Sequence, residues 1–268
     1  RRVLFRSRQD SGNQEQMRVV SEALCRLSYD PDNRIVMVCT PMLIAAVVEL
    51  MDDKSRHPQV LLSAATCAWC LSLEASSRQI LGQDRVCLEH LVKLCSHSNV
   101  ATVEASVSTL WNLSIEPQSH STLAQIPNII PTVGRLLDMP QFKVFKAAIS
   151  CLSHMSAANA CRPLLAREFG INARVVIATL SLLGGHTAAS VAASSLGTDD
   201  DDRQSDQGRV KRVIAMLQEI DNVDEHTALL FPAATVLCNC SADYEQGDRL
   251  GLIPGMFNAL CGLLQHPS

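Results

Sequence analysis

A short apolar segment that ends in serine recurs about every 42 residues along this chain of 268 residues. Six units align on that segment, with their serines separated by 44, 42, 39, 42 and 46 residues. The six are Ser28, Ser72, Ser114, Ser153, Ser195 and Ser241. In five units a leucine follows the serine by 22 residues, at Leu50, Leu94, Leu136, Leu217 and Leu263. A repeat of this length is typical of a helical solenoid, in which each unit packs only against its neighbours.

The pattern inside each unit predicts helices. The residues one and four positions before the serine are mostly apolar, as in Leu110 and Leu113, and this spacing places them on one helix face. Each unit reads as a polar turn, a short helix, a longer helix that ends at the leucine, and a longest helix that ends at the next serine. We therefore predict an all-α solenoid of about six units that occupies residues 17–268 as one elongated domain.

Composition excludes several classes of function. A net charge of −4 gives no electrostatic case for binding nucleic acid, which requires clustered Lys and Arg. The 11 cysteines lie along apolar stripes without a disulfide framework, which indicates reduced, buried thiols in the cytosol or nucleus. The uncharged stretches 35–48 and 175–198 are too short or too turn-rich for a span of about 20 apolar residues, so no membrane span is predicted.

The first seven residues resemble a cloning product. Arg1–Ser7 is the translation of a nucleotide string that resembles the end of a common sequencing-library adapter, so we predict a non-native scar. The alternative is a disordered basic tail. Residues 1–16 are assigned to this scar and a disordered lead-in. Because the chain also stops just after Leu264, at a repeat edge, a fragment truncated at both ends is expected.

Chemical motifs do not support catalysis or metal binding. Cys67, Cys70, Cys87 and His90 have a spacing that superficially suggests zinc, but Cys87 shares a core column with Leu43, Ile129 and Met256. The acidic run 199–202 lacks the ligand spacing of a calcium loop. No nucleophile elbow, phosphate loop, dinucleotide fingerprint or zinc-protease motif is present. We expect no enzymatic activity, no cofactor, no metal and no small-molecule substrate.

The repeated segments resemble armadillo repeats, the three-helix units found in beta-catenin and importin alpha. The resemblance is carried by Thr109-Leu110-Trp111-Asn112-Leu113-Ser114, which is similar to the end of an armadillo third helix. It is also carried by Gly251-Leu252-Ile253-Pro254 with the later Leu260-Cys261-Gly262-Leu263-Leu264, which is similar to a second helix. It spans residues 17–268, with HEAT repeats as the nearest alternative. It implies a right-handed superhelix whose third helices line a concave groove.

The resemblance also implies groove residues. In peptide-binding members an asparagine two positions before the serine pairs with the backbone of an extended peptide. Here that column contains Arg26, Cys70, Asn112, Cys151, Ala193 and Asn239, so only two of six positions match. The two tryptophans, Trp69 and Trp111, share the neighbouring column, where aromatic anchors commonly dominate interfaces. Packing between repeats is the alternative role for both indoles. The predicted protein-binding residues are Trp69, Trp111, Asn112, Asn239 and Arg26.

These features predict a non-enzymatic scaffold or adaptor that captures an extended or helical segment of a partner protein in the groove. Two alternatives stay open. One is a structural subunit of a ciliary or cytoskeletal assembly. The other is a nuclear-transport cargo adaptor, which the incomplete asparagine column disfavours. The expected location is the cytoplasm, with the nucleus and the cilium as alternatives.

Overall fold

The chain divides into two compact units, Arg1–Pro127 and Asn128–Ser268. The computed structural model describes residues 2–52, 57–184, 189, 192–193, 200–220, 222–242 and 247–265, with backbone alone for residues 2–13, 200–207 and 247. Within these ranges the secondary structure is α-helix and short 3-10 helix, without a β-strand. The all-α prediction is therefore confirmed.

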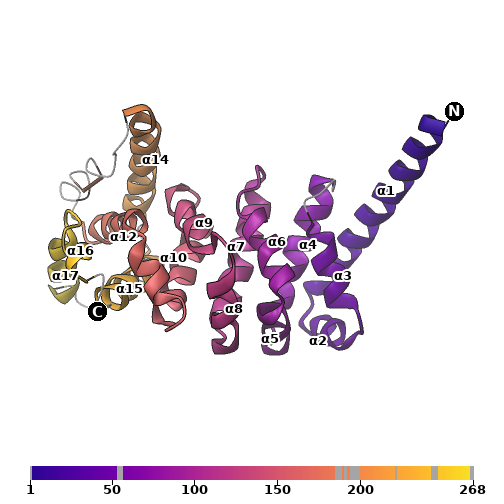
Figure 1. The fold of residues 1–268 in the computed structure, drawn as a ribbon, viewed down its shortest axis with the longest axis horizontal. Coiled ribbons are helices and arrows are strands. Elements are labelled where there is room, and N and C mark those ends of the chain that lie inside the picture. The colour runs from indigo at the N-terminus through magenta and orange to yellow at the C-terminus, as the bar shows by residue number, and fades with distance from the viewer. Residues whose placement is uncertain are drawn as a thin grey trace. The chain divides into compact units, whose positions relative to one another are not determined.

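Unit 1 is built from stacked groups of three helices. Its longest helices, the third helices of the groups, are α1, α4 and α7, and α4 packs against both of the others (Figure 1). The shorter first and second helices lie between them along the chain. The elements are α1 (Arg2–Ser28), α2 (Pro31–Cys39), α3 (Leu43–Leu50), α4 (Pro58–Leu71), α5 (Ala75–Gln83), α6 (Arg85–Leu94), α7 (Val100–Ser114), the 3-10 helix η1 (Pro117–Ser119) and α8 (His120–Gln125).

Polar side chains cap the starts of α2, α4, α6 and α7, whereas α3, α5 and α8 begin without such a bond. Asp84 accepts hydrogen bonds from the backbone N–H groups of Val86 and Cys87 at the start of α6. Asn99 does the same at the start of α7, and Pro58 occupies the first position of α4, where its missing N–H costs nothing. The starts of the capped helices are thus set by local sequence, while their orientation depends on how they pack.

A repeated hydrogen-bond motif closes the third helices at Ser28, Ser72, Ser114 and Ser156. The serine hydroxyl donates to the carbonyl three residues earlier, and a basic side chain six residues after the serine donates to the serine carbonyl. Arg34, Arg78, His120 and Arg162 fill the basic position after Ser28, Ser72, Ser114 and Ser156. The motif satisfies carbonyl groups that the end of a helix leaves without an intrahelical partner. The motif is not kept at Ser241, whose hydroxyl donates to the carbonyl four residues earlier and which a glycine follows by six residues.

This motif corrects the alignment of the fourth unit. The spacing predicts a unit that ends at Ser153, whereas the hydroxyl of Ser156 makes the repeated bond and Arg162 donates to the Ser156 carbonyl at 2.9 Å. Both serines lie in the same helix, one turn apart. The third and fourth serines are therefore 42 residues apart, not 39.

Unit 2 contains the remaining helices of the described chain. It contains α9 (Ile129–Arg135), the 3-10 helix η2 (Leu136–Asp138), α10 (Phe142–Ala157), α11 (Arg162–Arg167), α12 (Phe169–Leu182), α14 (Asp200–Gln218), α15 (Val223–Ser241), α16 (Gly247–Leu250) and α17 (Met256–Gln265). The third helices α10 and α15 pack directly on each other. Helix α14 packs against α12 and η2, and α17 also packs against α12.

The direct contact between α10 and α15 changes how the later units are understood. The predicted unit end at Ser195 lies outside the described residues. In unit 1, two helices separate each third helix from the next. In the described chain, three helices, α11, α12 and α14, lie between the third helices α10 and α15, which nevertheless pack on each other. Helices α16 and α17 then occupy the places of a first and a second helix.

The beginning of the chain is helical. Helix α1 starts at Arg2, so the backbone of residues 2–16 is not the disordered lead-in that the sequence suggested. Extending an existing helix adds one hydrogen bond for each residue fixed, and Glu15 supports it with an ion pair to Arg18 at 2.6 Å. The cloning origin of residues 1–7 stays a prediction.

Apolar side chains of all three helices in a group form the core. Leu71, Leu88 and Leu110 are fully buried, and eight of the eleven cysteines are buried with them. Among the described residues, no single helix is both long and apolar enough to cross a membrane. Helices α2 and α3 reach that length and composition only together, across a bend of 102°.

Candidate functional site

The third helices of unit 1 keep one face open to solvent. On α7 the residues that reach solvent recur every three or four positions, at Ala101, Glu104, Ser108 and Trp111. The residues between them, such as Val103 and Leu110, are buried. This spacing identifies one continuous helix face, which we call the open face.

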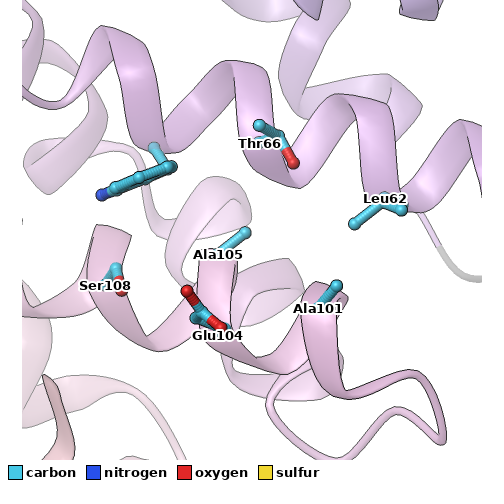
Figure 2. A pocket seen from close by; sticks show the side chains of 7 residues that line it. Leu62, Thr66, Ala101, Glu104, Ala105 and Ser108 are labelled. Carbon is cyan, nitrogen blue, oxygen red and sulfur yellow. The ribbon is translucent and has the colours of Figure 1, made fainter. Parts of the chain in front are cut away.

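A hollow of about 150 Å³ lies on the open face between α4 and α7 (Figure 2). Helix α4 contributes Leu62, Thr66 and Trp69, and α7 contributes Ala101, Glu104, Ala105 and Ser108. The residues on α7 other than Glu104 are small, which leaves room above the helix. The hollow therefore combines an apolar floor, one indole and one carboxylate.

The two predicted tryptophans occupy equivalent places on adjacent helices. Trp69 lines the hollow, while Trp111 lies one turn beyond Ser108 on the same face of α7. Both side chains are half-buried. Their backbone carbonyls accept the hydroxyl hydrogen bonds of Ser72 and Ser114. Each indole is thus attached to a helix end whose backbone is held in place.

The two predicted asparagines make the same bond in different units. Asn112 Nδ2 donates to Ser72 Oγ at 2.9 Å, and Asn239 Nδ2 donates to Ser156 Oγ at 3.0 Å. Each amide therefore ties its third helix to the serine that closes the preceding third helix. This bond uses one of the two N–H groups, and the amide carbonyl keeps its acceptor capacity for a ligand.

The five predicted residues are not gathered in one place. Trp69, Trp111 and Asn112 lie on α4 and α7, next to the hollow. Arg26 lies on α1, highly exposed, and pairs with Glu22 of its own helix at 2.5 Å. Asn239 belongs to unit 2. A role of any of the five in binding stays a prediction.

Sequence analysis did not single out the other residues of the hollow. Leu62 and Glu104 are each ten positions before their serine, and Thr66 and Ser108 are each six positions before it. Continuing the three-to-four-residue spacing backwards from the tryptophan column would have found all four. The segments that carry the repeat pattern are only the last turns of the helices, so the pattern gives no signal at the earlier turns.

The cysteine and histidine residues with zinc-like spacing serve other contacts. Cys67 Sγ donates to the Leu24 carbonyl, and His90 Nδ1 is 3.0 Å from the Val48 carbonyl oxygen. Burial raises the pKa of the Cys67 thiol to about 12 and also raises the pKa of Cys87, which disfavours the thiolate that a metal requires. In the described parts of the chain, no group of three His, Cys, Asp or Glu side chains is placed to hold a metal ion.

Solved structures resemble this chain over most of its length. One is a designed armadillo repeat protein, 17% identical, with a TM-score of 0.55 over 85% of this chain and 94% of its own. Another is a crystal structure of computationally designed armadillo repeat proteins for modular peptide recognition, 17% identical, with a TM-score of 0.57 over 85% and 95%. An engineered protein is 14% identical, with a TM-score of 0.52 over 93% and 92%.

No protein-family model matches the chain, and a search of the curated proteins finds no match either. The likeness to solved structures therefore shows the fold, an armadillo-type α-solenoid. The expectation drawn from the repeated segments is confirmed at that level.

Proposed function

We propose that this protein is a non-enzymatic binding scaffold that holds an extended segment of a partner protein along its open face. The hollow between α4 and α7 is the observation that carries the proposal, because it joins a half-buried indole, a carboxylate and small side chains on two adjacent repeats. One of the similar structures carries the words "modular peptide recognition" in its description, which supports a peptide as the ligand.

The chemistry of the hollow favours a basic side chain of the ligand. An indole face attracts a Lys or Arg cation by about 0.5–2 kcal/mol, depending on how far the pair is desolvated. The carboxylate of Glu104 adds a charge-assisted hydrogen bond to the same cation. Leu62 and Ala105 offer apolar surface to the methylene groups of the long side chain. We therefore assign a Lys or Arg side chain to this position of the ligand.

Asn112 extends the site by one step along α7. Its amide lies next to Trp111 and is oriented by the bond to Ser72. An amide held in this way binds a peptide backbone at a lower entropic cost than a freely rotating one. We assign it the backbone of the ligand, next to the residue that enters the hollow.

A nuclear-transport adaptor is the weaker candidate for the same surface. Such a function relies on an asparagine column that continues through successive repeats. With the fourth unit aligned on Ser156, the third helices of the described residues carry Arg26, Cys70, Asn112, His154 and Asn239 in this column. Three of these positions cannot pair with a peptide backbone as asparagine does, so a general scaffold fits the residues better.

The test uses a fluorescein-labelled decapeptide of alternating Lys and Arg, beside a decapeptide of alternating Glu and Ser. Fluorescence anisotropy measures binding of each to the full chain. We expect the basic peptide alone to bind, Trp69→Ala to weaken it about tenfold, and Glu104→Gln to weaken it several-fold.

Glu89→Gln is the matched control, because Glu89 is an exposed carboxylate on α6 that pairs with Arg85 outside the hollow. It removes one negative charge without touching the site, so binding should stay unchanged. Equal weakening by Glu89→Gln and Glu104→Gln would mean that net charge alone attracts the peptide. Binding that survives Trp69→Ala in full would contradict the assignment of the hollow.

A further inference from the structure

Helix α1 exposes apolar side chains in columns that the other third helices of unit 1 bury. Val20 and Leu27 lie eight and one positions before Ser28, and they are 52% and 49% exposed. In the same two columns α4 carries Ala64 and Leu71, which are 1% and 0% exposed. Helix α7 buries both columns as well. Side chains that are interior in two third helices therefore face solvent in the first one.

Unit 1 itself shows what covers these columns. Cys67 lies between Ala64 and Leu71 on one stripe of α4, and its Sγ donates to the Leu24 carbonyl of α1. The stripe thus faces the preceding third helix. Helix α4 also packs on α2 and α3, the first and second helices of its own repeat. The matching stripe of α1 runs through Ala23, which is exposed, and α1 is the outermost third helix of unit 1 (Figure 1).

Helix α17 exposes apolar side chains in columns that the second helices of unit 1 bury. Phe257 and Leu264 lie six positions before and one position after Leu263, the repeated leucine, and they are 67% and 88% exposed. In the same columns α6 carries Leu88 and is followed by Cys95, which are 0% and 3% exposed. The α3 segment buries both columns as well. Helix α17 is thus a second helix with two interior columns open to solvent.

The cover of a second helix is also visible in unit 1. Helix α3 packs on α4, and α6 packs on α7, so each second helix lies against the third helix of its own repeat. Helix α17 packs on α12, and it is the last helix of the described chain. Within the described residues, the repeat that α16 and α17 begin therefore has no third helix. Helix α1 is a third helix without a first and a second helix before it.

We propose that two copies of this chain join head to tail, with α1 of one copy packed as the third helix on α16 and α17 of the other copy. Val20 and Leu27 then gain the cover that their columns have on α4. Phe257 and Leu264 gain the cover that their columns have on α6. A second copy is the occupant because the chain carries both parts of one divided repeat, and each part exposes the columns that the other part covers elsewhere in the structure.

The contact joins two different surfaces, so it is heterologous. Each added copy brings a further α1 surface and a further α17 surface, and association therefore continues beyond the dimer unless a ring closes. Charge does not oppose the contact, because α17 contains no charged residue. The contact uses neither Trp69 nor Glu104, so it is independent of the proposed peptide site.

The test is sedimentation velocity of the full chain over a wide range of protein concentration. The mass of the parent should rise with concentration above that of one chain. Leu27→Glu blocks the α1 surface and Leu264→Glu blocks the α17 surface, so each variant alone should associate at least tenfold more weakly. An equal mixture of the two variants should form a dimer and nothing larger, because one intact α1 surface meets one intact α17 surface.

Val86→Glu is the matched control, because Val86 is 52% exposed on α6 and belongs to neither surface, and it should associate as the parent does. Circular dichroism checks the fold of each variant, and Val20→Glu or Phe257→Glu replaces one that does not fold. A parent that stays monomeric at every concentration would overturn the proposal. So would variants that associate like the parent, or a mixture that stays monomeric, since the contact would then lie elsewhere.

Discussion

Replacement of Arg78 by methionine tests whether the guanidinium groups join the repeats. Arg78 donates to Glu116 at 2.7 Å and to the carbonyls of Leu73 and Ser72 at 3.0 and 3.4 Å. The side chains of Arg78 and Glu116 are only 20% and 16% exposed. Methionine keeps most of the volume but leaves a carboxylate and two carbonyls without their donor. A hydrogen bond to a charged group contributes about 1.5–3 kcal/mol.

Water reaches part of this site, so the full cost of a buried charge does not apply. We expect Arg78→Met to lower the free energy of unfolding by about 2–3 kcal/mol. Urea unfolding followed by circular dichroism at 222 nm measures the change. Arg85→Met is the control, since Arg85 is 58% exposed and pairs with Glu89 within α6. An exposed pair of this kind contributes about 0.3–0.5 kcal/mol. If both variants lost the same stability, the role assigned to Arg78 would be wrong.

Three further outcomes are expected. Gly82→Ala should lower the thermal unfolding temperature, because the new Cβ would lie 1.9 Å from Ser119 Oγ. Gly208→Ala should leave that temperature unchanged, because its Cβ would meet no atom within 4 Å. Asn112→Ala should lower the free energy of unfolding in urea by about 1 kcal/mol, because it removes the hydrogen bond to Ser72. Gln79→Ala, at an exposed residue, is the control, and an equal loss of stability in both variants would contradict this. Iodoacetamide should modify Cys67 far more slowly than the exposed Cys39 between pH 7 and pH 10, because burial raises the Cys67 pKa to about 12 and keeps the thiol protonated. Mass spectrometry of tryptic peptides measures the two rates, and equal rates would contradict the burial of Cys67.

Part of the candidate site could be found from sequence. Trp69 was singled out because it shares a column with Trp111, and it does line the hollow. Glu104 carries no such signal, because it lies ten positions before the serine, outside the segment that repeats. The sequence also contains a signal that identifies Ser156 as the closing serine of the fourth unit. A basic residue follows Ser28, Ser72 and Ser114 by six positions, and Arg162 follows Ser156 by six, whereas Asn159 follows Ser153. Spacing between serines alone cannot distinguish two serines one helical turn apart.

The sequence by itself determined the helical class, the period and the columns that form the core. These depend on which residues share one face of a helix, and side chains three or four apart share a face in any α-helix. The starts of several helices were also determined locally, by residues such as Asp84 and Asn99 that cap the first turn.

Tertiary structure alone decided which helices are neighbours. Helix α15 packs on α10 although α11, α12 and α14 lie between them along the chain. Asn239 consequently bonds to Ser156, 83 residues away in sequence. Leu62 and Glu104 meet across one hollow only because α4 and α7 are adjacent. Period and amphipathicity give each helix an apolar face, but many helices can cover such a face. The partner is selected by side-chain fit and by hydrogen bonds between groups distant in sequence, which no local pattern records.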